Sequence, residues 1–171
     1  MTDADFRDAF HRHKDVVYRF AYRITGDGSA AEDVVQDCFA ALWRKPEGFD
    51  PERGALRAYL LGVARNMVLK RWRRERPHEV LDDATSICPP FDVAAFARGE
   101  AVRKAVLMLP PLQRETLVLA EYEGMSLEEI AKTTATELAA VKSRLHRARQ
   151  NLRRMLTPLL QPKGTVNATK R

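Results

Sequence analysis

Basic side chains are concentrated in two short segments of the chain, and their chemistry is that of phosphate binding. Residues 142–154 (KSRLHRARQNLRR) contain six Lys and Arg and no acid, and residues 65–76 (RNMVLKRWRRER) contain six and a single acid. Clusters of this kind neutralise the phosphates of nucleic acids. Trp72 lies among the charges of the second segment, where its ring could stack on a base, although its spacing from Val68 favours packing in a core. Both segments indicate a nucleic-acid partner.

Residues with catalytic or metal-binding chemistry are not arranged as a site. The chain has no HExxH, P-loop or nucleophile-elbow motif, which argues against an enzyme that acts on nucleic acid. The four histidines (His11, His13, His78, His146) lack metal-ligand spacing with either cysteine. Cys38 and Cys88 lie 50 positions apart with no CxxC pair, which argues against a disulfide framework. We expect no catalytic residue, no metal and no cofactor.

The composition limits the classes of protein to which this chain can belong. With 171 residues, 45% apolar and 30% charged, the chain suits one ordinary soluble domain or two small ones. Its N-terminus, MTDADFRD, is acidic and therefore unlike a signal peptide, and no apolar run approaches the length of a bilayer span. We expect a cytoplasmic protein without membrane insertion.

Helical periodicity dominates the chain, with one or two helices expected over 3–25 and further helices over 30–45, 55–76, 94–108 and 111–123. Ser29 with Glu32, and Ser126 with Glu129, have the spacing of capping boxes at helix starts. Residues 77–93 contain acids and adjacent prolines without periodicity, which is typical of a linker. The expected fold is all-α: two small helical domains joined by a flexible acidic linker, with a helix-turn-helix in the C-terminal domain.

The helix-turn-helix is expected to begin at Ser126 and to continue into the basic segment. An apolar stripe along its second helix should pack against the preceding helices, and consists of Leu138, Val141, Leu145, Ala148 and Leu152. Six side chains fall off the stripe and can face DNA: Lys142, Ser143, Arg144, His146, Arg147 and Arg149. The turn has Ala135 where glycine is usual, so a positive φ there would be strained. A solvated basic helix is the plainer alternative, and the motif alone also fits a conventional helix-turn-helix regulator.

Three segments in order resemble a bacterial RNA polymerase sigma factor of the sigma-70 family, extracytoplasmic-function class, over residues from about 5 to 156. AEDVVQDCFAALWR resembles the helix that grips the β′ clamp, and FDPERGALRAYLLGVARN with KRWRRERP resembles the segment that opens and reads the −10 element. The stretch from LPPLQRETLVL to VKSRLHRAR resembles the −35 reading domain. Relatives often carry a Pro-x-Gly-Thr run before VKSRL, whereas this chain has Glu137 to Ala140, ELAA.

The resemblance implies a division of the chain and a set of contacts. Residues 1–76 would form the region 2 domain, 77–93 the linker, 94–156 the region 4 domain and 157–171 a disordered tail. The implied partners are core RNA polymerase (β′ clamp helices and β flap), promoter DNA and an anti-sigma factor, with a monomer when free. The implied contacts are Asp33, Gln36 and Asp37 with polymerase; Phe49, Arg65, Asn66, Lys70, Arg71, Arg73 and Arg74 with −10 DNA; and Lys142, Ser143, Arg144 and Arg147 with −35 DNA.

Overall fold

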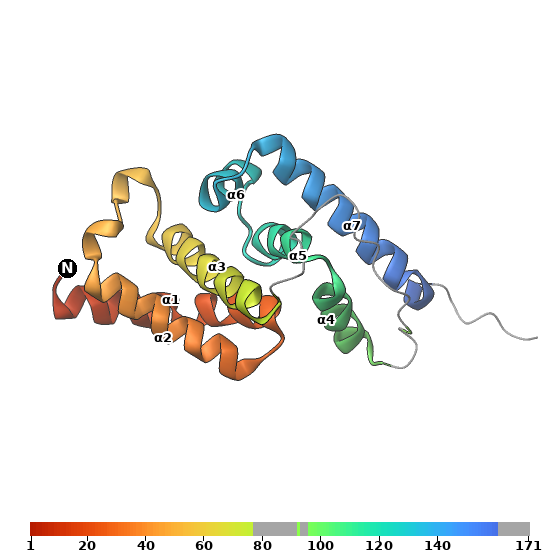
Figure 1. Cartoon of the computed structure of the whole chain (residues 1–171), viewed down its shortest axis with the longest axis horizontal. Coiled ribbons are helices and arrows are strands. Elements are labelled where there is room, and N and C mark those ends of the chain that lie inside the picture. The colour runs from red at the N-terminus through yellow and green to blue at the C-terminus, as the bar shows by residue number, and fades with distance from the viewer. Residues whose placement is uncertain (77–91, 93–95, 161–171) are drawn as a thin grey trace, which may run out of the picture.

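The protein is built from helices arranged in two groups (Figure 1). The computed structural model describes residues 1–76, 92 and 96–160, so nearly all of the expected linker and the end of the expected tail lie outside the described residues. Within those ranges no strand occurs, which confirms the predicted all-α class. The helices are α1 (Asp3–Thr25), α2 (Gly28–Arg44), α3 (Leu56–Glu75), α4 (Arg98–Met108), α5 (Pro111–Leu117), α6 (Leu127–Thr134) and α7 (Leu138–Leu160), with short helical turns η1 (Pro46–Gly48), η2 (Pro51–Arg53) and η4 (Val118–Tyr122).

The first domain consists of α1, α2 and α3, which pack on one another around an apolar core. A capping box starts α1, because Asp5 N donates to Thr2 Oγ1 at 3.2 Å and Thr2 N donates to Asp5 Oδ2 at 2.9 Å. The helix ends at Gly26, whose φ of 73° is in the left-handed region that glycine adopts without strain. The fully buried side chains include Val17, Phe20, Leu42, Leu60 and Leu61.

The start of α2 differs from the sequence expectation. Its N-cap is Asp27, whose Oδ1 accepts a hydrogen bond from Ala30 N at 3.1 Å. Ser29 is exposed inside the first turn, so the predicted capping box of Ser29 with Glu32 is wrong. Asp caps a helix as well as Ser does, and Asp27 directly follows the glycine that ends α1, so the next helix begins at the first residue able to cap it.

The second domain begins with α4 and α5 and continues into the helix-turn-helix. At the end of α5 the helix widens into the π-helical turn η4, in which Glu123 N donates to Val118 O, five residues back, at 3.1 Å. The predicted capping box at the start of α6 is confirmed, because Glu129 N donates to Ser126 Oγ at 3.1 Å and Ser126 N donates to Glu129 Oε2 at 2.7 Å.

The turn between α6 and α7 places Ala135 at φ 49° and ψ 47°, the left-handed conformation for which glycine is usual. Beyond it, the apolar stripe of α7 faces the core as predicted: Val141, Leu145 and Ala148 are buried, and Leu138 and Leu152 are half-buried. Because α7 continues to Leu160, residues 157–160 of the expected disordered tail are helical.

The two domains pack closely against each other. The first helix, α1, contacts α4, α5 and η4, while α3 lies against α6 (Figure 1). Two glycines permit the close approach: a Cβ at Gly26 would lie 2.9 Å from Leu107 Cδ1, and a Cβ at Gly62 would lie 3.3 Å from Thr133 Cγ2. We call the surface where α1 and α3 meet the second domain the domain interface.

Candidate nucleic-acid interface

The exposed face of α7 carries most of the side chains expected to meet duplex DNA. Lys142 and Ser143 are exposed, and Arg147 donates from Nη2 to Ser143 Oγ at 3.0 Å and from Nε to Ser143 O at 3.3 Å. The structure therefore places these three side chains on one surface, opposite the buried stripe. Arg144 is half-buried and donates to Thr136 Oγ1, at the turn, at 3.3 Å.

One further side chain that the sequence places off the apolar stripe also lies on this face. His146 is exposed and lies one turn beyond Lys142 and Ser143, beside Arg147. Arg149, farther round the helix, is paired with Glu121 of η4, since its Nε donates to Glu121 Oε1 at 2.9 Å. The ion pair links α7 to η4 within the second domain.

The C-terminal half of α3 carries the second basic surface. Lys70, Arg73 and Arg74 are exposed along the last turns of the helix. Arg71 is held by acids on both sides: its Nε donates to Glu75 Oε1 at 2.8 Å, and its Nη1 lies 3.5 Å from Asp33 Oδ2 of α2. This contact places Asp33, which we expect to bind polymerase, beside Arg71, which we expect to bind −10 DNA.

Arg65 is not on that open surface. Its Nε donates to Glu115 Oε2 of the second domain at 2.9 Å, and its side chain is only 15% exposed. Asn66, the next residue, is exposed, and its Oδ1 accepts a bond from Arg65 Nη1 at 3.3 Å. Arg65, which we predicted to contact −10 DNA, is therefore bound to a carboxylate in this arrangement.

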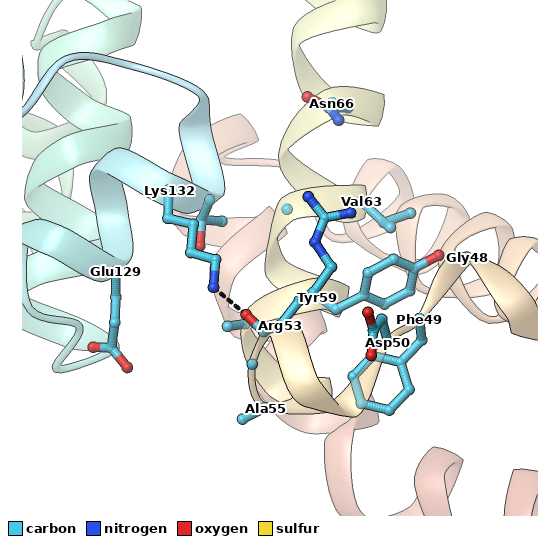
Figure 2. A pocket seen from close by; sticks show the side chains of 14 residues that line it. Gly48, Phe49, Asp50, Arg53, Ala55, Tyr59, Val63, Asn66, Glu129 and Lys132 are labelled. Carbon is cyan, nitrogen blue, oxygen red and sulfur yellow. Dashed lines mark hydrogen bonds between the residues drawn. The ribbon is translucent and has the colours of Figure 1, made fainter.

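A cavity of about 380 Å³ opens where α3 meets α6, and it gathers aromatic and polar side chains (Figure 2). Phe49, from the turn between η1 and η2, is half-buried with its ring centroid 5.6 Å from that of Tyr59. Burial raises the pKa of Tyr59 above its ordinary value of 10.0, so the phenol stays neutral. The lining includes Asn66 and Val63 from α3, and Glu129, Lys132 and Thr133 from α6.

The face of α2 expected to bind polymerase is open to solvent. Asp33, Gln36 and Asp37 are all exposed on it. The same face continues to Trp43, two turns beyond Gln36, which is 48% exposed and meets the Phe6 ring at a centroid distance of 5.0 Å. Sequence reasoning passed over Trp43, although its seven-residue spacing from Gln36 could have found it.

No helix in the described ranges is long and apolar enough to cross a membrane. Within the same residues, no three His, Cys, Asp or Glu side chains gather closely enough to hold a metal ion. Cys38 is buried with its Sγ donating to Leu60 O at 3.5 Å, and burial raises its pKa from an ordinary value of 9.0 to about 12. This thiol is therefore a packed core group.

Comparison with known proteins matches both domains to the sigma-70 family. Residues 9–78 match the family Sigma-70 region 2, and residues 99–152 match Sigma-70, region 4. The chain is 32% identical over 158 residues to the ECF RNA polymerase sigma factor SigL of Mycobacterium tuberculosis, covering 90% of this chain and 89% of that protein. It is 28% identical to SigW of Bacillus subtilis over 169 residues, or 90% of each. It is 35% identical to SigE of Mycolicibacterium smegmatis over 150 residues, but spans only 58% of that protein's length.

Two solved structures share the whole arrangement. The sigma factor RpoE from Bartonella quintana, solved with the anti-sigma factor NepR, matches with a TM-score of 0.71 and 26% identity over 90% of this chain and 97% of that chain. CnrH, solved with the cytosolic domain of CnrY, matches with a TM-score of 0.69 and 28% identity over 92% of this chain and 90% of that chain.

Proposed function

Because this chain belongs to the extracytoplasmic-function class of the sigma-70 family, we propose that it binds core RNA polymerase and directs it to −35 and −10 promoter elements. It then helps to open the DNA at the −10 element. The protein acts as a specificity subunit without catalytic residues of its own, and it works in the cytoplasm, where polymerase is.

The observation that carries this proposal is the presence of two exposed basic surfaces on two different domains. One runs along α7 at the exposed Lys142 and Ser143 and the half-buried Arg147, and the other covers the end of α3 at Lys70, Arg73 and Arg74. A single α-helix in the major groove suits duplex DNA. A basic surface beside an aromatic cavity suits unpaired bases, since pockets offset the cost of unstacking them. We assign residues 94–156 to the −35 duplex and residues 1–76 to the −10 strand.

We propose that core polymerase fixes the distance between the two DNA-binding surfaces. We propose that Asp33, Gln36 and Asp37 bind the β′ clamp helices, and that the second domain meets the β flap. Each DNA-reading surface alone binds weakly, and tethering both to polymerase raises the effective concentration of the second contact. A monomer can then read two unlike elements, whereas a conventional helix-turn-helix regulator usually dimerises on paired half-sites.

An anti-sigma factor is the further partner that we propose. The two solved relatives with similar folds were captured with NepR, an anti-sigma factor, and with the cytosolic domain of CnrY. Their chains align with this one over at least nine-tenths of its length. A partner of that kind would hold this protein inactive until it is released.

The test uses sigma-free core polymerase and a library of genomic DNA fragments. Adding the purified chain should produce transcripts that start at discrete promoters. Asp33→Ala with Gln36→Ala should weaken binding to core polymerase while leaving duplex DNA binding by α7 unchanged. Asp15→Ala, at an exposed acid on a different helix, α1, is the matched control. Absence of both transcription and polymerase binding would refute the proposal.

A further inference from the structure

The middle of the exposed face of α7 is a ridge that carries no Lys or Arg. Four exposed side chains follow one another along it at steps of four, three and four residues: Ala139, Ser143, His146 and Gln150. Residues at these spacings lie one above another on a helix. This row, which we call the central ridge, lies on the side of α7 opposite the buried stripe of Val141, Leu145 and Ala148.

The basic side chains of α7 lie on the two flanks of the central ridge. Lys142 is exposed on one flank, and Arg144 and Arg147 are half-buried on the other. Hydrogen bonds within the chain hold the two arginines there: Arg144 Nη1 donates to Thr136 Oγ1 at 3.3 Å, and Arg147 Nη2 donates to Ser143 Oγ at 3.0 Å. Positive charge therefore follows both edges of the exposed face, and its middle has no permanent charge.

This arrangement matches the cross-section of a major groove. The base edges form the floor of the groove and the phosphates of the two strands border it, so a helix lying in it turns its flanks to phosphates and its ridge to bases. The N-terminal residues of such a helix are the ones that reach base edges. Ala139 and His146 span seven residues, or about 10 Å of helix axis. Gln150 lies one turn beyond this reading part of the ridge.

The side chains of the reading part differ in the bases that they can distinguish. Ala139 offers only a methyl group, whose partner in the major groove is the C5-methyl group of thymine. His146 offers a ring N–H donor, and guanine is the base that presents acceptors alone. Ser143 can donate or accept, so its hydroxyl does not select one base. Selection in this region therefore depends on Ala139 and His146.

We propose that Ala139 and His146 determine which −35 sequence this protein prefers. Ala139 selects a T·A pair through the thymine methyl group, and His146 selects a G·C pair by donating to guanine N7. The 10 Å between the two residues places the two pairs no more than about three base-pair steps apart. The flanking basic residues set affinity without choosing a sequence.

This inference rests on the proposed function, because it takes α7 as the helix that reads the −35 duplex. It adds a feature of this particular chain. In the Pro-x-Gly-Thr run that relatives often carry, the third position is glycine, whereas the ELAA run of this chain has Ala139 there. The thymine contact is therefore made by a methyl group that those relatives lack.

The first test changes the chemistry of the ridge and reads the preferred sequence. A promoter found in the transcription test is randomised over its −35 element, selected by the full-length protein bound to core polymerase, and sequenced. Ala139→Arg should change the selected T·A pair to G·C by about five-fold or more, because arginine pairs with guanine. Gln150→Arg is the matched control, since it adds the same charge to the same ridge beyond the reading part. It should raise affinity and leave the preferred sequence unchanged.

The second test removes single atoms or groups from the DNA. Deoxyuridine in place of the selected thymidine removes only the methyl group, and should weaken binding of the unmodified protein about four-fold, the value of one buried methyl group. The same DNA should not weaken binding of Ala139→Gly. Removing the guanine acceptor with 7-deazaguanine should cost the unmodified protein about five-fold and His146→Ala nothing. Both substituted side chains are exposed, so neither change removes core packing.

The outcomes separate this inference from the proposed function. An equal effect of deoxyuridine on the unmodified protein and Ala139→Gly would overturn the thymine contact, and an equal effect of 7-deazaguanine on the unmodified protein and His146→Ala would overturn the guanine contact. A selected sequence that lacks the two pairs, or that changes in Gln150→Arg as it does in Ala139→Arg, would overturn the assignment of the reading part. An unmodified protein that selects no −35 sequence at all would instead refute the proposed function.

Discussion

Replacing Ala135 by glycine should stabilise the second domain. Ala135 adopts φ 49°, and an L residue in the left-handed region costs about 1–2 kcal/mol. Glycine relieves that strain but has more freedom in the unfolded chain, which costs about 0.4–1 kcal/mol. The difference at mid-range favours glycine by about 0.8 kcal/mol. Ala135 is exposed, and its N–H bond to Lys132 O at 3.4 Å does not involve the side chain, so no packing is lost.

Urea unfolding followed by circular dichroism would measure this change. With a slope of about 2 kcal/mol per molar, the midpoint should rise by about 0.4 M. Both tryptophans, Trp43 and Trp72, belong to the first domain, so their fluorescence reports separately whether that domain is affected. Ala135→Val is the matched control: its β-branched side chain is less suited to positive φ and should lower the midpoint. A lower midpoint for Ala135→Gly would refute the strain argument.

Three further predictions concern the helix cap, the buried thiol and the face of α7 that we propose reads DNA. Ser126→Ala should cost about 1 kcal/mol in thermal or urea unfolding, because the α6 capping box is lost. With Cys88→Ser, folded Cys38 should resist thiol reagents, and the urea midpoint should fall as pH rises past 9.0, because the folded pKa is raised to about 12 and only the unfolded thiol ionises; an unchanged midpoint at pH 10 would contradict this. Lys142→Ala and Arg147→Ala should each reduce by about one the slope of log affinity for duplex DNA against log salt, and an unchanged slope would exclude a phosphate contact.

The fold was largely predictable because its signals are local. The stripe through Val141 and Leu145 required a buried helix face, and the spacing of Ser126 and Glu129 located the start of α6. Capping at α2 was predicted at the wrong residue because Asp27 and Ser29 are both good caps, and sequence alone does not show where the preceding turn ends.

The candidate site was predictable in type but not in its accessibility. Charge clustering identified the basic segments, yet it treated Arg65 and Lys70 as equivalent, whereas in the structure Arg65 is bound to the buried Glu115, 50 positions away in the sequence. Two residues that pair across 50 positions of sequence leave no periodic signal in a single sequence. The acids themselves lie within the apolar stretch RETLVLAEYE, where a buried carboxylate has no sequence signature that distinguishes it from an exposed one.

The π-helical turn η4 makes the contact between the domains sensitive to chain length. Each α-helical residue turns the chain by about 100°. Widening the helix at Val118 sets the direction of the two acids that follow: Glu121 meets Arg149 in its own domain, and Glu123 meets Arg57 in the other. Deleting one of the uncharged residues of 118–122 would turn Glu123 away from Arg57 although every charged side chain remained. Among homologues, a one-residue gap at this turn would thus indicate a changed contact between the domains more clearly than a substitution of one of the charged residues.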